Sequence, residues 1–181
     1  MAQPCQFEPK EMPSLMMAPI FSWLLFTCLP LSGLTQGQEE VPVPPSARSS
    51  CPGDFAYYSF HCYGLLYHRE TWNSSESLCQ EYPSGHLTSL LNEAEASFVA
   101  TMIMENGYVQ SPVWIGLHDA EKDRRWQWSS KVPYLYQAWQ KGSPRATRLN
   151  YCVSLTPEAG FQRWKDESCQ NKYPYLCKFR A

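Results

Sequence analysis

The chain has 181 residues, a formal net charge of −2 at pH 7 and a hydrophobic fraction of 44%. Its length fits one domain with an extra segment, and its apolar content is enough to build one core, which argues against intrinsic disorder. The near-neutral charge excludes the strongly basic domain that is typical of nucleic-acid-binding proteins.

The first 37 residues predict a secretory signal peptide. Residues 15–34 are mostly apolar, and the small residues Thr35 and Gly37 follow them, which is the order of a hydrophobic region and a cleavage site. We expect cleavage after Gly37 and a secreted protein. An uncleaved membrane anchor is the alternative, because a bilayer span needs about 20 apolar residues, but the prolines of this stretch disfavour it. Whether translation starts at Met1 or Met12 stays open.

Residues 38–50, QEEVPVPPSARSS, predict an extended linker, because they are rich in proline and have no apolar period. The bond between Arg48 and Ser49 is an accessible site for a trypsin-like protease in such a linker. A solvated arginine without a role is an equally good interpretation. The folded domain is predicted over residues 51–181.

Cysteine usage agrees with an extracellular protein. Cys5 and Cys28 fall in the leader, and the remaining cysteines form an even set that predicts three disulfides. Their spacing alone allows many connectivities. No pair has the spacing of a structural zinc site, so no zinc is expected. The set is Cys51, Cys62, Cys79, Cys152, Cys169 and Cys177.

Helices are predicted early in the domain and strands around and after them. Residues 55–67 are rich in aromatic side chains with partial alternation, which indicates one or two strands. A short helix is predicted within 71–82 and a longer one within 90–108. Short strand-like runs follow at 113–117, 125–128, 151–155, 161–166 and 173–179. This order predicts an α+β domain.

The longer helix has clear start and stop signals. Asn92 is a suitable cap with Glu95 three residues later, and Gly107 supplies the stop. The apolar residues expected to share one face are Leu91, Phe98, Met102 and Ile103. The shorter helix begins near a sequon, Asn73-Ser74-Ser75, which is competent for N-glycosylation in a secreted protein; Asn is also a good helix cap.

Several segments, in this order along the chain, resemble a C-type lectin-like domain: VWIGL, AWQKGSP, YCVSL, RWKDESC and YPYLCKF. More narrowly, PSGHLTSLLNEAEASFVA, WIGLHD and GFQRWKD resemble the regenerating islet-derived (Reg, lithostathine and pancreatitis-associated) proteins. The resemblance covers residues 45–179.

This resemblance implies two helices, two small antiparallel sheets and a long loop region, with WIGL as a core strand. It also implies the disulfides Cys51–Cys62, Cys79–Cys177 and Cys152–Cys169.

Sugar-binding members of that family hold calcium with oxygen ligands on both sides of a loop proline, an acid before the next cysteine, and a Trp-Asn-Asp triplet. This sequence keeps the loop residues Trp139, Gly142 and Pro144. The ligand positions hold Ser143, Arg145, Asn150, Lys165 and Asp166.

Calcium takes about six to eight oxygen ligands, and this set offers one carboxylate and two cations. A unit positive charge about 4 Å from a divalent ion costs roughly 8 kcal/mol at an effective dielectric near 20. We therefore expect no calcium and no other cofactor. Lys165 is expected to pair with Asp166 or to occupy the place of the ion.

Some relatives bind bacterial cell-wall sugar through a Glu-Pro-Asn segment after the GLHD strand, where this chain has AEKDRR. A solvated turn is the simplest interpretation. In the functional interpretation, Asp119, Glu121 and Asp123 bind sugar hydroxyls, while Lys122, Arg124 and Arg125 attract acidic groups. A second basic set is Lys141, Arg145, Arg148, Arg163 and Lys165. Two basic patches on a near-neutral protein suit an anionic glycan or an anionic membrane.

The sequence thus predicts a secreted, calcium-independent glycan-binding protein of the Reg type, with an antimicrobial or trophic role in mucosal or pancreatic secretion. The alternative is a protein ligand for a cell-surface receptor, or a protein that self-assembles after cleavage at Arg48. No nucleophile, zinc-protease or phosphate-loop motif occurs, so an enzyme is not expected. The predicted ligand-binding residues are Asp119, Glu121, Asp123, Arg124, Arg125, Arg145, Asn150, Lys165 and Asp166.

Overall fold

The computed structural model describes residues 51–105, 110–145 and 149–181. The predicted signal peptide, the linker with Arg48, the helix stop Gly107 and the basic residue Arg148 lie outside these residues. Among the helices of the described ranges, none combines the length and apolar character that a membrane span requires.

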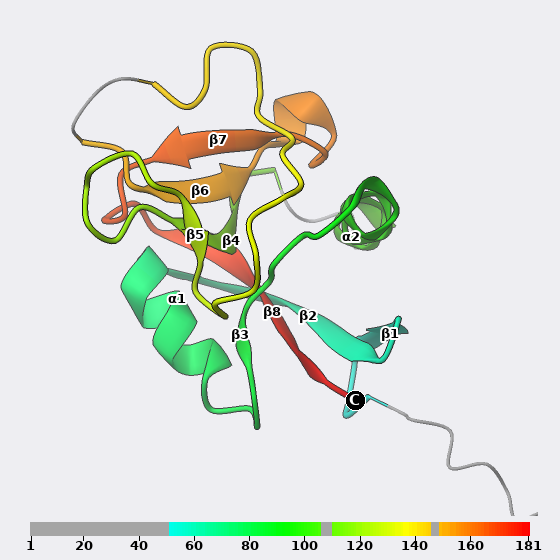
Figure 1. The fold of residues 1–181 in the computed structure, drawn as a ribbon. Helices are drawn as coiled ribbons and strands as arrows, with labels where there is room; N and C mark the ends of the chain where they lie inside the picture. Colours follow the sequence, from blue (N-terminus) through cyan, green and yellow to red (C-terminus); the bar gives the residue numbers. More distant parts are fainter. Residues whose placement is uncertain (1–50, 106–109, 146–148) are drawn as a thin grey trace, which may run out of the picture. The chain divides into compact units, whose positions relative to one another are not determined.

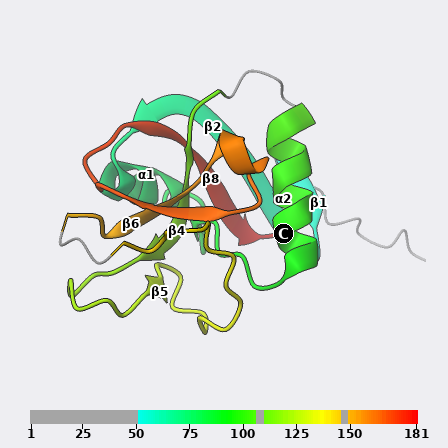
Figure 2. The same cartoon turned by 90° about the horizontal axis from the view of Figure 1, so that it is seen from above.

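The described elements confirm an α+β domain with two α-helices (Figure 1). The helices are α1 (Trp72–Cys79) and α2 (Glu93–Glu105), with a short 3₁₀ turn, η1 (Pro157–Ala159). The strands are β1 (Ala56–Tyr58), β2 (His61–Glu70), β3 (His86–Leu87), β4 (Val113–His118), β5 (Gln127–Trp128), β6 (Cys152–Leu155), β7 (Trp164–Glu167) and β8 (Tyr173–Arg180). The two helices lie on opposite sides of β8 in both ribbon views (Figures 1 and 2).

All strands join one mixed sheet, in the order β1-β2-β8-β4-β6-β7, with β3 beside β8 and β5 beside β4. The expectation of two separate antiparallel sheets is therefore corrected. The two antiparallel parts are joined where β4 and β8 run parallel, at the pair Trp114 and Tyr175. Both side chains are fully buried, so the two parts share one core at this junction.

The start of each helix is fixed by a side-chain cap. In α2 the Asn92 Oδ1 accepts from the Glu95 N–H at 2.9 Å, and the Glu95 carboxylate accepts from the Leu91 N–H at 2.8 Å, which confirms the predicted capping pair. In α1 the cap is Thr71. Asn73 lies within the first turn, so its predicted capping role is wrong.

The buried face of α2 differs in part from the prediction. Ile103 is buried as expected, and Phe98 and Met102 are half-buried at the margin of the core. Leu91 precedes the helix and is exposed, so it does not share that face. The helix instead buries Ala96, Val99 and Ala100 along with Glu95.

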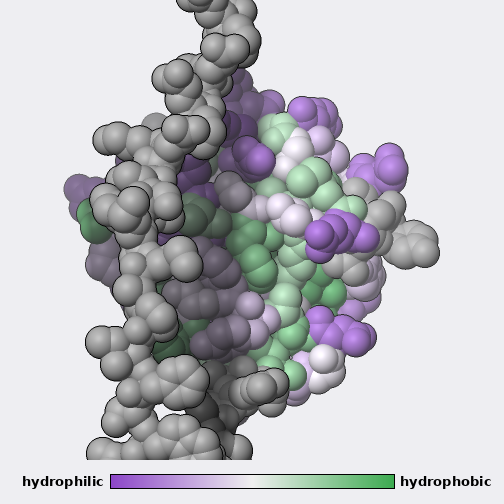
Figure 3. Space-filling view, turned by 90° about the vertical axis from the view of Figure 1, so that its right-hand side faces the viewer, coloured by the Kyte–Doolittle hydropathy of each residue, from purple (hydrophilic) through white to green (hydrophobic). Residues whose placement is uncertain are grey.

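The core lies under α2 and along β4. Trp114, Ile115 and Leu117 are fully buried, which confirms that WIGL is a core strand. On the side of the domain that carries α2 and β1, apolar surface is bordered by polar side chains (Figure 3). Tyr58 of β1 and Phe98 of α2 stack with their ring centroids 4.5 Å apart and close the core between these two elements.

The three disulfides pair as the family resemblance implies: Cys51–Cys62, Cys79–Cys177 and Cys152–Cys169. Cys79–Cys177 joins the end of α1 to β8 across a sequence separation of 98 residues. In the chain-entropy model a loop of that length stabilises the fold by about 4–5 kcal/mol.

Candidate functional site

The long segment between β5 and β6 is held against β7 by backbone hydrogen bonds. The Trp164 N–H donates to the Ala138 carbonyl and the Gln140 N–H donates to the Trp164 carbonyl, both at 2.9 Å. Trp164 is fully buried, and the ring of Trp139 meets it edge-on at 5.7 Å. The segment, yellow in Figure 1, is therefore anchored in the core at Trp139.

A cavity of about 430 Å³, which we call the long-loop cleft, opens beside this anchor. It is lined by Arg124, Trp126, Tyr134, Gln137, Trp139, Pro144 and Arg145. The rings of Trp126 and Trp139 lie 5.0 Å apart, and the Trp139 Nε1–H donates to the Tyr134 hydroxyl at 2.8 Å. Half-buried aromatic rings thus form one wall of the cleft, and two guanidinium groups border it.

Arg124 is positioned by a buried carboxylate. Asp119 is 2% exposed, and its oxygens accept from the N–H groups of Asp123 at 3.1 Å and Arg124 at 2.9 Å. These bonds hold Arg124 in the left-handed region, at φ 71°, which a non-glycine residue adopts only with support. Asp119 therefore supports the turn, and it is not among the residues that line the long-loop cleft.

The Arg124 side chain connects this turn to the calcium positions of the family. Its Nη1 donates to the Asn150 carbonyl at 3.1 Å, and the Asn150 side-chain amide donates to the Asp166 carbonyl at 3.2 Å. Arg145 also reaches Asp166, with Nη2 3.3 Å from its carbonyl oxygen and Nε 3.7 Å from its Oδ2. The structure therefore brings together four of the predicted residues: Arg124, Arg145, Asn150 and Asp166.

Lys165 is not part of this group. Neighbouring residues of a strand point to opposite faces of a sheet, so Lys165 and Asp166 diverge, and the predicted pair between them is wrong. The Lys165 Nζ instead lies 2.8 Å from the Glu167 carboxylate, two residues along β7. This hydrogen bond raises the pKa of Lys165.

The residues at the family's calcium position do not fit a calcium ion. Asp166 supplies the one carboxylate and is fully buried, and neither of its carboxylate oxygens makes a hydrogen bond within the described residues. The Arg145 guanidinium, with Nε 3.7 Å from the Asp166 Oδ2, would oppose a divalent cation. No group of three His, Cys, Asp or Glu side chains suited to a metal occurs in the described ranges.

The remaining residues of the AEKDRR segment face solvent. Glu121, Asp123 and Arg125 are exposed, and the Arg125 Nε lies 3.3 Å from the Asp123 carboxylate. An exposed pair of this kind contributes about 0–1 kcal/mol. Lys122 lies over the ring of Tyr151, 5.3 Å from its centroid. These residues form the solvated turn that was the simpler interpretation, and only Arg124 lines the cleft.

Asn73 of the sequon is exposed on α1. It borders a second cleft of about 360 Å³, whose lining includes His118, Lys122 and Tyr151. Its exposure is compatible with a glycan, and glycosylation of Asn73 stays a prediction.

A comparison with protein families matches residues 68–179 to the lectin C-type domain. The chain belongs to this family. Within it, the protein is similar to lithostathine-1 of Mus musculus, with 44% identity over 159 residues that cover 88% of this chain and 96% of the relative. It is also 40% identical to regenerating islet-derived protein 3-beta of Rattus norvegicus, over 89% of this chain and 95% of that one.

Solved structures agree with this lectin-domain assignment. The crystal structure of human lithostathine shares 44% identity, with a TM-score of 0.73, over 80% of this chain and all of that one. The carbohydrate-recognition domain of cow CD23, solved in the presence of a GlcNAc2Man3 oligosaccharide, shares 25% identity with a TM-score of 0.64 over 73% of this chain and 97% of that one.

Sequence reasoning missed the aromatic wall of the cleft in this lectin-domain protein. The sequence places Trp126 in a strand-like run and Trp139 in the family's loop pattern, and neither is predicted to line a cleft. Tyr134 and Gln137 are in no predicted site. The segment 126–139 is rich in aromatic residues, but this composition does not indicate which of them line a cleft and which enter the core. Their convergence depends on the fold of a loop that has no periodic pattern.

Proposed function

We propose that the protein is a secreted glycan-binding protein that works without calcium, and that the long-loop cleft is its ligand site. The observation that carries this proposal is the pair Arg124 and Arg145 at the edges of a cleft whose wall is made by Trp126 and Trp139. The apolar face of a sugar ring packs against an aromatic side chain, and the exposed Arg145 guanidinium can bind a carboxylate or a sulfate. Arg124, whose Nη1 donates to the Asn150 carbonyl, adds positive charge at the edge of the cleft.

The ligand class follows from the charge of the lining. Among the described residues, two arginines and no acidic side chain line the cleft, so a glycan that carries uronate or sulfate groups fits better than a neutral one. The structure of cow CD23 in the presence of an oligosaccharide supports carbohydrate as the ligand class within this fold.

Independence from calcium rests on Asp166 and Arg145. The guanidinium already stands 3.7 Å from the buried carboxylate, and it supplies the positive charge that calcium would bring in other family members. Secretion rests on the predicted signal peptide and on the three disulfides, which are typical of extracellular proteins.

The test is binding of the secreted protein to a panel of microbial and host glycans, acidic and neutral, with calcium or with EDTA. We expect acidic glycans to bind equally in both conditions. Arg124→Gln and Arg145→Gln should each weaken binding about tenfold, the effect of losing one hydrogen bond to a charged group. Arg163→Gln, at an exposed arginine outside the cleft, is the matched control and should have no effect.

Loss of binding in EDTA would show that the calcium argument is wrong. Binding that ignores both arginine variants would place the ligand elsewhere. If no glycan binds, the protein-ligand or self-assembly function becomes the better proposal. Trypsin cleavage at Arg48 followed by sedimentation then tests self-assembly, since a product that remains fully soluble argues against it.

A further inference from the structure

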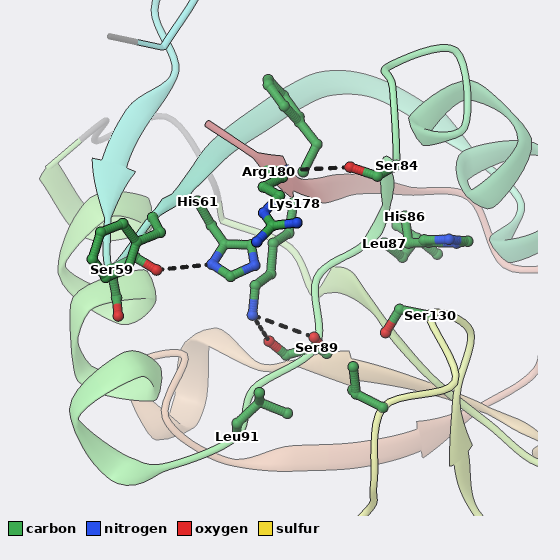
Figure 4. A pocket seen from close by; sticks show the side chains of 13 residues that line it. Ser59, His61, Ser84, His86, Leu87, Ser89, Leu91, Ser130, Lys178 and Arg180 are labelled. Atoms are coloured by element: carbon green, nitrogen blue, oxygen red, sulfur yellow. Dashed lines mark hydrogen bonds between the residues drawn. The ribbon is translucent and has the colours of Figure 1, made fainter. Parts of the chain in front are cut away.

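A separate cavity of about 600 Å³, which we call the hairpin cavity, lies between the β1–β2 hairpin, the segment around β3 and the end of β8 (Figure 4). It shares no lining residue with the long-loop cleft. Its volume falls within the range of about 300–1,000 Å³ that is usual for small-molecule sites. Nothing in the glycan-binding proposal uses this cavity.

Among the described residues, the ionisable side chains that line the cavity are His61, His86, Lys178 and Arg180. Lys178 is neutralised by Glu95, 2.5 Å from its Nζ, and His86 pairs with Glu76 at 2.6 Å. Arg180 has no ion pair within the described residues. Arg180 is therefore the cation of this lining that no described ion pair neutralises.

The register of β2 and β8 places the side chains of His61, Lys178 and Arg180 on the same face of the two strands. His61 of β2 lies directly opposite Arg180 of β8, so the two side chains share a face of the ribbon. Lys178 lies two residues before Arg180 on the same strand and points the same way. In Figure 4 the His61 ring and the Lys178 ammonium group face the same space, and Lys178 donates to Ser89.

The rest of the lining is largely apolar and carries serine hydroxyls. Leu87, Leu91, Val132 and Phe179 supply hydrocarbon surface. The Ser130 Oγ is buried and makes no hydrogen bond within the described residues.

The turn between β1 and β2 places the exposed side chain of Phe60 beside the cavity, and its backbone is strained. Ser59 and Phe60 have φ values of 46° and 66°, a pair of positive angles that hairpin turns normally assign to Asn and Gly. Phe60 is nevertheless 73% exposed, so core packing does not explain why a large side chain occupies this position. Strain of this kind concentrates at ligand sites.

We propose that this cavity binds a small amphipathic carboxylate, with the carboxylate group at Arg180 and His61 and the hydrocarbon tail against Leu91, Val132 and Phe60. The headgroup charge complements Arg180, which has no ion pair within the described residues, and the tail covers apolar surface that is otherwise open to water. A ligand of this class satisfies both features, whereas a neutral alkane or an inorganic anion satisfies one.

The probe is octanoate, titrated into the isotopically labelled secreted protein and followed through backbone amide NMR shifts. We expect saturable shifts confined to the hairpin, the segment 84–91 and residues near Ser130. Acetate carries the same headgroup without the tail, and octyltrimethylammonium carries the same tail with the opposite charge. Both should bind at least about tenfold more weakly, because each lacks one of the two contributions.

Arg180→Gln should weaken octanoate binding about tenfold, and Arg163→Gln should leave it unchanged. Phe60→Gly separates the role of Phe60 in binding from its role in the fold, because glycine tolerates the positive φ at this position without strain. It should keep or raise the unfolding midpoint while it weakens octanoate about fivefold through lost apolar contact. Arg145→Gln, at the long-loop cleft, should leave the affinity for octanoate unchanged. The octanoate proposal and the glycan proposal are therefore tested independently.

Equal binding of octanoate and octyltrimethylammonium would overturn the proposal, as would an unchanged affinity in Arg180→Gln. A lower unfolding midpoint in Phe60→Gly with unchanged octanoate affinity would mean that Phe60 serves the fold alone.

Discussion

The ammonium group of Lys178 in β8 lies 2.5 Å from the carboxylate of Glu95 in α2, and both side chains are more than nine-tenths buried. The Tyr63 hydroxyl donates to the same carboxylate oxygen at 2.5 Å. Burial and this carboxylate raise the pKa of Tyr63. The other Glu95 oxygen accepts from the Leu91 N–H. One carboxylate thus connects the start of α2 to two strands of the sheet.

Lys178→Met should destabilise the protein by about 3–5 kcal/mol, because it leaves the Glu95 carboxylate buried without a cation. Urea unfolding measures the change. Lys165→Met, which breaks the more exposed pair with Glu167, is the control and should cost about 0–1 kcal/mol. Adding Glu95→Leu to Lys178→Met should recover part of the loss, because it removes the unpaired charge but leaves the Tyr63 hydroxyl and the Leu91 N–H without their acceptor. A loss in Lys178→Met below that of the control would contradict the cost assigned to a buried Glu95 carboxylate without its cation.

Asp119→Ala should weaken acidic glycan binding about tenfold, although Asp119 does not line the cleft. Two backbone N–H groups lose their acceptor, at a cost of about 1–3 kcal/mol, and Arg124 is released from its left-handed conformation. The exposed Glu121, in the same turn, supplies the control Glu121→Ala, which should bind normally. If Asp119→Ala also binds normally, Arg124 does not need this support.

Calcium binding should appear when the ligand positions are restored to the pattern of the sugar-binding relatives. The variant combines Ser143→Glu, Arg145→Asn, Asn150→Glu and Lys165→Asn, which removes the Arg145 guanidinium from Asp166 and restores the oxygen ligands of the family pattern. Calorimetry should detect a dissociation constant of about 10⁻⁴–10⁻³ M, as in extracellular modules. The parent protein and Arg145→Asn alone are the comparisons, and both should show no calcium binding. A parent protein that binds calcium would refute the charge argument.

Acid should destabilise the protein partly through His118. Its ring stacks on Trp72 with centroids 4.5 Å apart, and burial lowers its pKa. Below the ordinary histidine pKa of about 6.5, the unfolded chain takes up a proton that the folded chain does not. The contribution of His118 is thus fully present above that pH and declines as the pH falls towards the lowered pKa.

Urea unfolding at several pH values between about 7.5 and 5 measures this dependence. Carboxylates also contribute to the slope, so the informative quantity is the difference between the parent protein and His118→Gln. The variant should show a shallower loss of stability on acidification. Identical slopes would show that His118 titrates equally in the folded and unfolded chains.

The sequence predicted those features that local chemistry or family pattern specifies. The capping pair of Asn92 and Glu95, the core strand at Trp114 and the pairing of Cys79 with Cys177 are all confirmed. The partner of Lys165 was predicted wrongly because adjacency in sequence was given more weight than strand alternation. The alternation of β7 pairs Lys165 with Glu167, and it was readable from the sequence.

Other features depend on tertiary contacts. The buried pair of Glu95 and Lys178 is separated by 83 residues, and nothing near either residue indicates the other. The approach of Arg124 to Asn150 depends on a supported positive φ and on a loop without periodicity. Local patterns do not specify such contacts, because they arise only when distant segments pack together.

The last residue of the chain has a practical consequence for how the two sites are assayed. The Ala181 N–H donates to the Phe60 carbonyl at 3.0 Å, and Arg180 lines the hairpin cavity. The carboxyl end therefore lies beside that cavity (Figure 1). A purification tag or surface tether attached there would crowd the octanoate site and leave the long-loop cleft accessible. Immobilised protein therefore suits glycan arrays, while fatty-acid titrations call for untagged protein in solution.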